Sequence, residues 1–207
     1  MNVLVATPAR VRTPNRLLKL SQRIYDSLTW PDRERAVCRS EYPPATGLCG
    51  NNARARNELV ETYLLPEHTH ILWLDVDLVS VPSDIIELLA EISENDIVAP
   101  FVLMEPNEWF GSDRFYDVGG FRQNGKDFSL FPPYCDGGDL VELDSVGSCY
   151  LIPAEVYRWG ARYSPVGDEV EHPSLMKAAR EMEFKVYARR DVIVRHAFLP
   201  YYGVDLH

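Results

Sequence analysis

The stretch Ile71-Leu72-Trp73-Leu74-Asp75-Val76-Asp77 joins an apolar run to two acidic residues. The apolar run predicts a buried strand, and the Asp-x-Asp pair falls where that strand would end. In open α/β sheets, ligands bind just beyond the carboxyl ends of the strands. Two carboxylates there suit a hard divalent cation such as Mg²⁺ or Mn²⁺, which prefers oxygen ligands. The alternative interpretation is that both aspartates only shape a turn or cap a helix.

Length and composition describe an ordinary globular chain. The 207 residues are 46% hydrophobic and 25% charged, which predicts one domain with a sizeable core. The net charge of −10 argues against a broad nucleic-acid surface, because an acidic chain gains nothing from phosphate neutralisation. Four cysteines without a Cys-x-x-Cys pair argue against a zinc site and a disulfide scaffold. No apolar run reaches the ~18 residues of a membrane span. We therefore expect a cytoplasmic protein with reduced thiols.

The first half of the chain alternates predicted strands and helices. This βαβαβαβ order predicts a mostly parallel sheet with helices on its faces. The strands are expected at residues 2–6, 35–39, 69–74 and 97–103, and the helices at 15–28, 51–65 and from Pro82 onward. In the second half we expect short antiparallel strands at 116–130, one or two strands at 140–152, helices at 154–159 and 173–182, and strands at 184–187 and 192–195. The fold class is therefore α/β.

Two further segments are expected near the Asp-x-Asp pair. The loop Thr7-Pro8-Ala9-Arg10 follows the first strand, so topology places it at the same sheet edge as Asp75. Arg54 and Asn57 lie three residues apart and share one face of a helix near its start, where anions are attracted. A guanidinium and an amide there could hold a nucleotide. A solvated helix face is the alternative interpretation.

The ordered set of these motifs resembles the GT-A fold glycosyltransferases over nearly the whole chain. The segments that carry the resemblance are Thr7-Pro8, Ala53-Arg54 with Asn57, Trp73-Leu74-Asp75-Val76-Asp77, Val146-Gly147-Ser148, Glu171-His172 and His196. The resemblance implies one domain over residues 1–207, with a parallel nucleotide-binding half at 1–103 and a mixed-sheet acceptor half at 104–207.

The resemblance also implies a donor site and a metal site. In that family the first loop and the Arg/Asn helix hold the nucleotide of a sugar-nucleotide donor, which points to Thr7, Pro8, Arg10, Arg54 and Asn57. The Asp-x-Asp holds the divalent metal on the diphosphate, which assigns Mn²⁺ or Mg²⁺ to Asp77, with Asp75 near the ribose and the metal. His196 follows the apolar run Val192-Ile193-Val194 and matches a histidine that often completes the coordination.

The catalytic base departs from the family pattern. An acidic pair, usually Glu-Asp, opens a late helix in the relatives, and in inverting members its second carboxylate is the base. Here the pair is Glu171-His172. Glu171, Asp168, Glu169 or His172 could take a proton from the acceptor, or the reaction retains configuration and needs no such base.

The resemblance thus implies transfer of a sugar from a nucleoside-diphosphate sugar, with a UDP-sugar the expected donor, to the hydroxyl of a carbohydrate or other acceptor. The net charge argues against a nucleic-acid acceptor without excluding it. Three alternatives stay open. A haloacid dehalogenase-like phosphatase would use Asp75 as nucleophile and Asp77 as acid/base, but two βα units precede its expected first strand. A sugar-phosphate nucleotidyltransferase would need a glycine-rich first loop. A carbohydrate-binding module would bind without turnover.

Overall fold

A computed structural model gives the structure of the chain. It describes residues 1–11, 13–40, 47–93, 95–106, 120–124, 127–130, 138–166 and 171–197; side chains at 40, 47–49 and 123–130 fall outside the description. Within these ranges no helix is long and apolar enough to cross a membrane.

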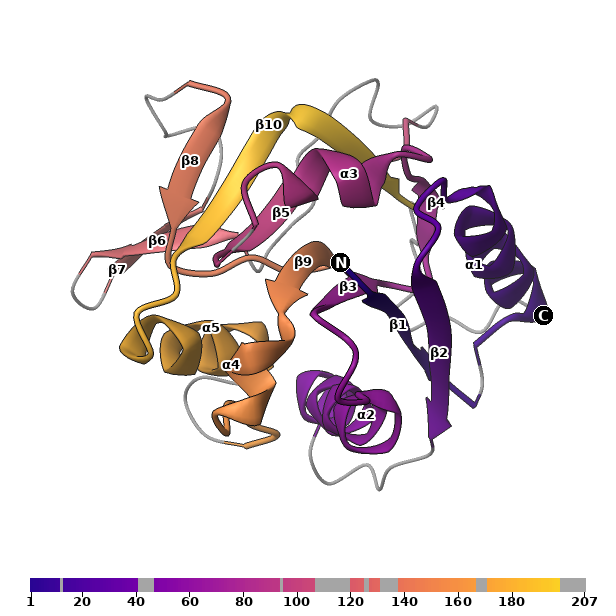
Figure 1. Ribbon diagram of the computed structural model, residues 1–207, viewed down its shortest axis with the longest axis horizontal. Coiled ribbons are helices and arrows are strands. Elements are labelled where there is room, and N and C mark those ends of the chain that lie inside the picture. Colours follow the sequence, from indigo (N-terminus) through magenta and orange to yellow (C-terminus); the bar gives the residue numbers. More distant parts are fainter. Residues whose placement is uncertain are drawn as a thin grey trace.

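An eight-stranded sheet forms the centre of the molecule, in the order β2-β1-β3-β9-β5-β10-β4 with β8 beside β10 (Figure 1). A separate hairpin pairs β6 with β7. The strands are β1 (Val3–Arg10), β2 (Arg33–Ser40), β3 (His70–Leu74), β4 (Leu78–Ser80), β5 (Ile97–Met104), β6 (Phe121–Asn124), β7 (Asp127–Leu130), β8 (Leu140–Leu143), β9 (Cys149–Pro153) and β10 (Val186–His196).

Most strands of the large sheet run in one direction, which confirms the predicted α/β class. β1 is parallel to β2 and β3, and β5 is parallel to β10. β9 lies between β3 and β5 and is antiparallel to both, so the two parallel groups point the same way. β4 and β8 run opposite to β10. The sheet is thus built from both halves of the sequence, with β9 as the join.

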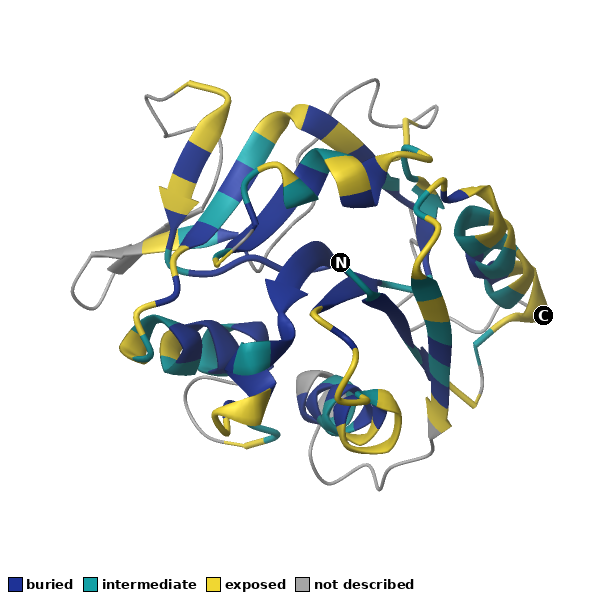
Figure 2. Cartoon of the chain, viewed as in Figure 1, coloured by how far each residue is buried: buried dark blue, intermediate teal, exposed yellow. Residues whose placement is uncertain are grey.

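Helices cover both faces of this sheet (Figure 1). Side chains alternate along each strand, so Ile71 and Trp73 of β3 pack into one core cluster and Leu72 and Leu74 into the other. The first cluster is closed by α2 (Gly47–Tyr63), α4 (Ala154–Arg158) and α5 (His172–Glu181), the second by α1 (Asn15–Ser27) and α3 (Ile85–Ala90). β3 and β9 are buried along their whole length, as the dark ribbon at the centre of Figure 2 shows.

Four details differ from the sequence prediction. The segment from Thr7 to Arg10, expected as a loop after the first strand, is the second half of β1 and pairs with β2 along its whole length, because sheet pairing extends past the apolar run. The helix expected from residue 51 begins at Gly47, which places Arg54 about two turns inside α2 rather than in its first turns. The short strand β4 was not predicted, because three residues carry too little periodicity. The strands expected at 184–187 and 192–195 form one strand, β10, with an irregularity between Arg189 and Ile193.

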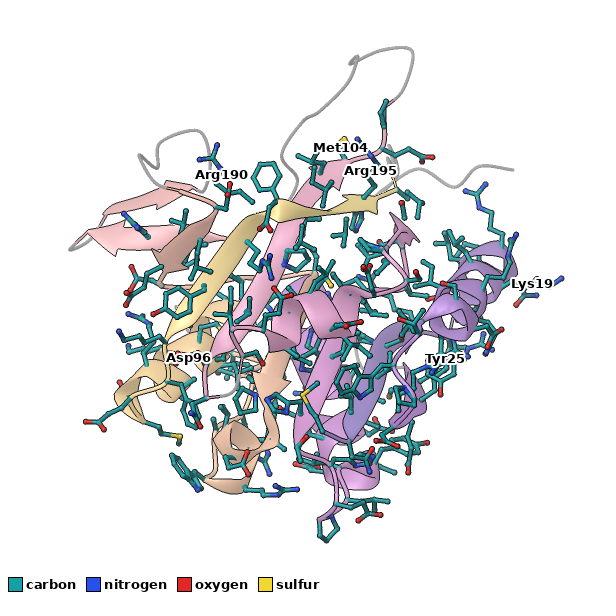
Figure 3. All side chains as sticks on the ribbon, turned by 45° about the horizontal axis from the view of Figure 1, so that its top comes forward. Lys19, Tyr25, Asp96, Met104, Arg190 and Arg195 are labelled. Atoms are coloured by element: carbon teal, nitrogen blue, oxygen red, sulfur yellow. The ribbon has the colours of Figure 1, made fainter. Side chains whose placement is uncertain are left out.

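The sheet directions bring several strand ends to one edge. β3 and β10 both end there, and β9, running the other way, begins there. The amide of Asp75 donates to the carbonyl of Ser148 just before β9 at 3.0 Å, and the amide of Ala197 after β10 donates to the carbonyl of Asp77 at 2.8 Å. Figure 3 shows Met104 and Arg195 side by side where β5 and β10 approach this edge.

Candidate active site

Arg56 stands at the centre of the candidate site, although its side chain is only 1% exposed. Its Nη2 donates to Oδ1 of Asp75 at 2.6 Å, and its Nε donates to Oε1 of Glu171 at 3.2 Å. Nη2 also lies 3.2 Å from Nε2 of His172. One guanidinium therefore links the first aspartate of the Asp-x-Asp pair to both members of the Glu-His pair.

The helix α2 places Arg56 on its buried face. Ala53 and Val60, three residues before and four after, are both buried in the core. The guanidinium lies 5.0 Å from the ring centre of Trp73 and 5.7 Å from that of Tyr163. Burial by itself would lower the pKa of Arg56, but nearby negative charge, chiefly that of Asp75, holds it well above its ordinary value.

Sequence reasoning selected Arg54 and Asn57 and missed Arg56. The signal was present in the helix spacing, since an arginine in phase with Ala53 and Val60 lies on the apolar face. A buried guanidinium requires carboxylate partners. Glu171 lies more than a hundred residues from Arg56 along the chain, so the sequence alone could not identify it as a partner.

The two carboxylates that hold Arg56 have raised pKa values. Burial is the main cause for Asp75 and for Glu171, and Arg56 opposes the rise at both. The Asp75 side chain is 23% exposed and the Glu171 side chain 10%. Asp75 thus combines contact with Arg56 and access to solvent, whereas Glu171 is buried.

Asp77 and His196 form a second pair at the same edge. Nε2 of His196 lies 2.9 Å from Oδ1 of Asp77, and Nδ1 lies 2.9 Å from the carbonyl oxygen of Ala197. Both facing atoms are acceptors, so each ring nitrogen needs a proton, or Nε2 needs a metal cation in place of its proton. Burial would lower the pKa of His196, but the contact with Asp77 outweighs it and raises the pKa.

This pair fits a divalent cation. A carboxylate oxygen and an imidazole nitrogen converge, while Nδ1–H donates to a backbone carbonyl, as in metal-binding histidines. Within the described ranges no three His, Cys, Asp or Glu side chains gather as a metal cage. Two protein ligands with open positions suit Mg²⁺ or Mn²⁺ bound together with water and substrate phosphates. Asp75 already pairs with Arg56, so Asp77 and His196 are the better placed ligands.

His172 is engaged at both ring nitrogens. Arg56 can only donate, so Nε2 of His172 accepts from it, and Nδ1 lies 3.4 Å from the hydroxyl of Tyr150. Burial lowers the pKa of His172 well below its ordinary value. The ring is therefore neutral and its one acceptor nitrogen is in use.

Backbone strain marks the same site. Glu171 has φ 63° and ψ −122°, a conformation that glycine adopts in tight turns and other residues rarely do. Ser148, whose carbonyl binds the amide of Asp75, also has a positive φ of 55°. Strained residues persist where the surrounding structure fixes them, and they cluster at functional sites.

The other predicted site residues lie in β1 and α2 and differ in exposure and contacts. Thr7 is buried in β1, Pro8 is half-buried and Arg10 is exposed at the end of that strand. Arg54 is half-buried on α2. The amide of Asn57 makes two hydrogen bonds to the backbone of Tyr163, at 2.8 and 3.0 Å, a structural role that sequence reasoning did not foresee.

Asp168 and Glu169 lie outside the described residues, so their proposed role as base stays a prediction.

The fold is that of the GT-A glycosyltransferases. The structure of GalNAc-T7 with UDP, GalNAc and Mn²⁺ aligns with a TM-score of 0.54 at 15% identity, over 95% of this chain and 44% of that one. The structure of S. aureus TarS aligns with a TM-score of 0.57 at 11% identity, over 97% of this chain and 37% of that one. At such identities the likeness defines the fold alone.

Sequence comparison points to a particular group. Residues 51–131 match the Anp1 family profile. The chain is 24% identical to the mannan polymerase II complex ANP1 subunit of Saccharomyces cerevisiae, over 72% of this chain and 35% of that protein. It is 27% identical to the mannan polymerase complex subunit mnn9 of Schizosaccharomyces pombe, over 76% of this chain and 52% of that protein. The chain thus spans about a third to a half of these curated relatives. Neither the phosphatase nor the nucleotidyltransferase alternative gains support.

We predict that Glu171→Gly is more stable than Glu171→Ala. Both changes remove the carboxylate, but only alanine keeps a Cβ in the strained conformation. The difference in unfolding free energy should be about 1–2 kcal/mol in favour of glycine, after the larger unfolded-state entropy of glycine is subtracted. Urea unfolding of both variants measures it. At Glu61, an exposed helical control, alanine should be the more stable. Alanine being the more stable at both positions would contradict the strain.

We also predict a specific pH dependence for the pair of His196 and Asp77 in chelator. The folded-state pKa of His196 is raised, so the pair's contribution to stability is fully present below the unfolded value of about 6.5. The contribution is lost as pH rises through the folded pKa. The stability difference between wild type and His196→Gln, from urea unfolding at a series of pH values, should shrink with rising pH. A difference that grows with pH would show that the pair is not charged.

Proposed function

We propose that this chain is a metal-dependent glycosyltransferase that moves a sugar from a nucleoside-diphosphate sugar to an acceptor hydroxyl. The observation that carries the proposal is the pairing of Asp77 with His196 at the strand edge of a GT-A fold, beside the Arg56-bound Asp75. The carboxylate of Asp77 and the imidazole of His196 face each other and require either a proton or a cation between them. A metal ion at this position could also bind the diphosphate of a donor.

The comparisons support the same class of reaction. One structural neighbour was solved with UDP, a sugar and Mn²⁺, and the sequence relatives are named as subunits of mannan polymerase complexes. A UDP-sugar and a mannose-bearing nucleotide are therefore the first donors to test. A mannan-like carbohydrate is the first acceptor, and a partner subunit is a further expectation that rests on those names alone.

In the proposed reaction each residue has a distinct task. Asp77 and His196 would hold Mn²⁺ or Mg²⁺, and the metal would supply positive charge against the diphosphate leaving group. Asp75, held by Arg56, would contact the donor ribose and the metal. Thr7, Pro8, Arg10 and Arg54 remain the proposed contacts to the nucleotide, and Asn57 a weaker one because its amide binds Tyr163.

Glu171 is the best placed base among the described residues, if the reaction inverts configuration. Burial raises the pKa of its carboxylate, which makes Glu171 a stronger base toward the proton of an acceptor hydroxyl. His172 is less suited because its acceptor nitrogen faces Arg56. Asp168 is the next candidate. A retaining reaction would need none of them as base.

A panel of sugar nucleotides with Mn²⁺, read out as released nucleoside diphosphate, tests the proposal. We expect turnover with at least one UDP-sugar or with GDP-mannose, and its loss in chelator. Asp77→Asn should lower turnover by about 100-fold or more while the protein stays folded, because the developing charge is no longer neutralised. The exposed Asp84→Asn should leave turnover unchanged.

The outcomes separate the candidate functions. Donor binding in calorimetry without turnover, across a panel that includes mannan oligosaccharides, would favour a binding module. Turnover that survives both chelator and Asp77→Asn would remove the metal from the mechanism.

A further inference from the structure

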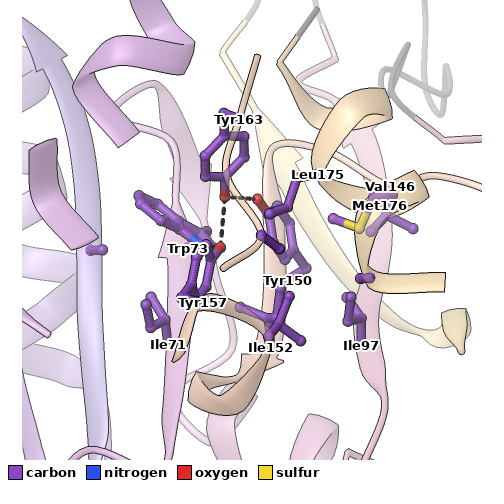
Figure 4. Packing of buried hydrophobic residues seen from close by; sticks show 14 of the residues in the cluster. Ile71, Trp73, Ile97, Val146, Tyr150, Ile152, Tyr157, Tyr163, Leu175 and Met176 are labelled. Carbon is purple, nitrogen blue, oxygen red and sulfur yellow. Dashed lines mark hydrogen bonds between the residues drawn. The ribbon is translucent and has the colours of Figure 1, made fainter. Parts of the chain in front are cut away.

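A chain of buried hydroxyl groups lies behind the candidate site (Figure 4). The hydroxyl of Tyr163 bonds to the hydroxyls of Tyr150 and Tyr157, the latter at 2.9 Å. The indole Nε1 of Trp73 donates to the hydroxyl of Tyr157 at 2.9 Å. At the other end the hydroxyl of Tyr150 meets Nδ1 of His172. The three tyrosines are at most 2% exposed.

The Arg56 end sets the direction of the protons in this chain, because Nη2 of Arg56 lies 3.2 Å from Nε2 of His172, closer than Oε1 of Glu171 at 3.5 Å, which could accept from a protonated Nε2. Arg56 can only donate, so Nε2 of His172 accepts and the neutral ring carries its proton on Nδ1. Nδ1–H then donates to Tyr150. The Tyr150 proton goes to Tyr163, and the Tyr163 proton to Tyr157, which also accepts from Trp73. The protons of His172 Nδ1, Tyr150, Tyr163 and the Trp73 indole then each have an acceptor in the chain.

This direction gives the guanidinium of Arg56 a fixed orientation. His172 accepts from Nη2, so Nη2 is shared between His172 and Asp75, while Nε is directed at Glu171. The rings of Trp73 and Tyr163, which pack edge to face with centres 5.7 Å apart, lie against the same guanidinium. Nη1 is buried and has no hydrogen-bond partner within the described part of the protein. Nε and Nη2 thus make the contacts of the guanidinium with Glu171, Asp75 and His172.

Arg56 is too deeply buried to reach a substrate, yet it holds the carboxylates of Asp75 and Glu171, whose side chains are 23% and 10% exposed. Asp75 follows the end of β3 and Glu171 directly precedes α5, so the two carboxylates come from segments almost a hundred residues apart. In the proposed function these are the donor side and the acceptor side of the site. The buried guanidinium of Arg56 thus contacts one carboxylate on each side.

We infer that Arg56 is a positioning residue that locks Asp75 and Glu171 in one geometry, with the chain from His172 through the tyrosines to Trp73 fixing its orientation. The inference rests on the proposed function only in assigning Asp75 to the donor side of the site and Glu171 to the acceptor side. It assigns no contact between Arg56 and the substrate, and it leaves metal binding to Asp77 and His196.

Two variants and a control test this role. Arg56→Gln removes the charge, Arg56→Lys keeps it without the planar fork, and Arg162→Gln changes an arginine whose side chain is 39% exposed. Displacement of reacting groups by about 1 Å can cost ~100-fold in rate. We expect kcat to fall by about that factor in Arg56→Gln, with a smaller fall in Arg56→Lys and none in Arg162→Gln. Mn²⁺ affinity, measured by electron paramagnetic resonance without donor, should change by less than about threefold, a factor worth only ~0.6 kcal/mol.

A purely structural Arg56 would behave differently. Loss of activity would then follow the folded fraction, which thermal unfolding measures, and Arg56→Lys would recover activity only as far as it recovers stability. That result, or a wild-type kcat in Arg56→Gln, would overturn the inference. A large loss of Mn²⁺ affinity in Arg56→Gln would also overturn it, because Arg56 would then be shaping the metal pair.

A readout without activity keeps this test separate from the proposed function. Nitrogen-15 NMR of the histidine rings, assigned with His172→Gln, reports which nitrogen of His172 carries the proton. We expect the Nδ1–H form in wild type, with Nε2 unprotonated. The Nε2–H form would overturn the inference even in an active enzyme, since Arg56 could not then donate to that nitrogen. If His172 carries its proton on Nδ1 but the protein transfers no sugar, the hydrogen-bond network stands and only the proposed function fails.

Discussion

The burial of the Arg56 charge is the constraint on which the site depends. An isolated ion in a protein interior is costly, and removing one partner of a buried pair typically destabilises a protein by about 3–5 kcal/mol. Arg56 is almost fully enclosed, so Asp75 and Glu171 must come to it. That requirement draws the end of β3 and the start of α5 together. It also accounts for the strained backbone of Glu171, which carries the carboxylate to the guanidinium despite an unfavourable φ.

The sheet makes this convergence possible. β9 enters antiparallel between β3 and β5, so its start, near Ser148, lies beside the ends of β3 and β10. Carboxylates, a histidine and a strained turn from residues 75 to 196 then share one edge. The tyrosines that support Arg56 come from β9, α4 and the segment that leads toward α5, so the second half of the chain supplies much of the network behind the first half's Asp-x-Asp pair.

Local sequence patterns predicted the elements well and their long-range partners poorly. The apolar run before Asp75 proved to be a fully buried strand, and the run before His196 a strand with Val192 and Val194 buried and Ile193 exposed; both end at the expected edge. The start of α2 at Gly47 was missed because Gly47 and Gly50 weaken a helical pattern. The position of β9 follows from pairing across more than seventy residues, which no local pattern contains. Arg56 was the clearest missed signal, since its phase within α2 already placed a charge on an apolar face.

The most direct measurement of the central claim, that the strand edge is a metal and donor site, is the anomalous scattering of Mn²⁺ in crystals soaked with Mn²⁺ and UDP. The account predicts one strong peak bounded by Asp77 and His196, with the diphosphate on its open side and Arg56 still bound to Asp75 and Glu171. A peak held by other residues, or an empty edge at saturating Mn²⁺ and UDP, would contradict it.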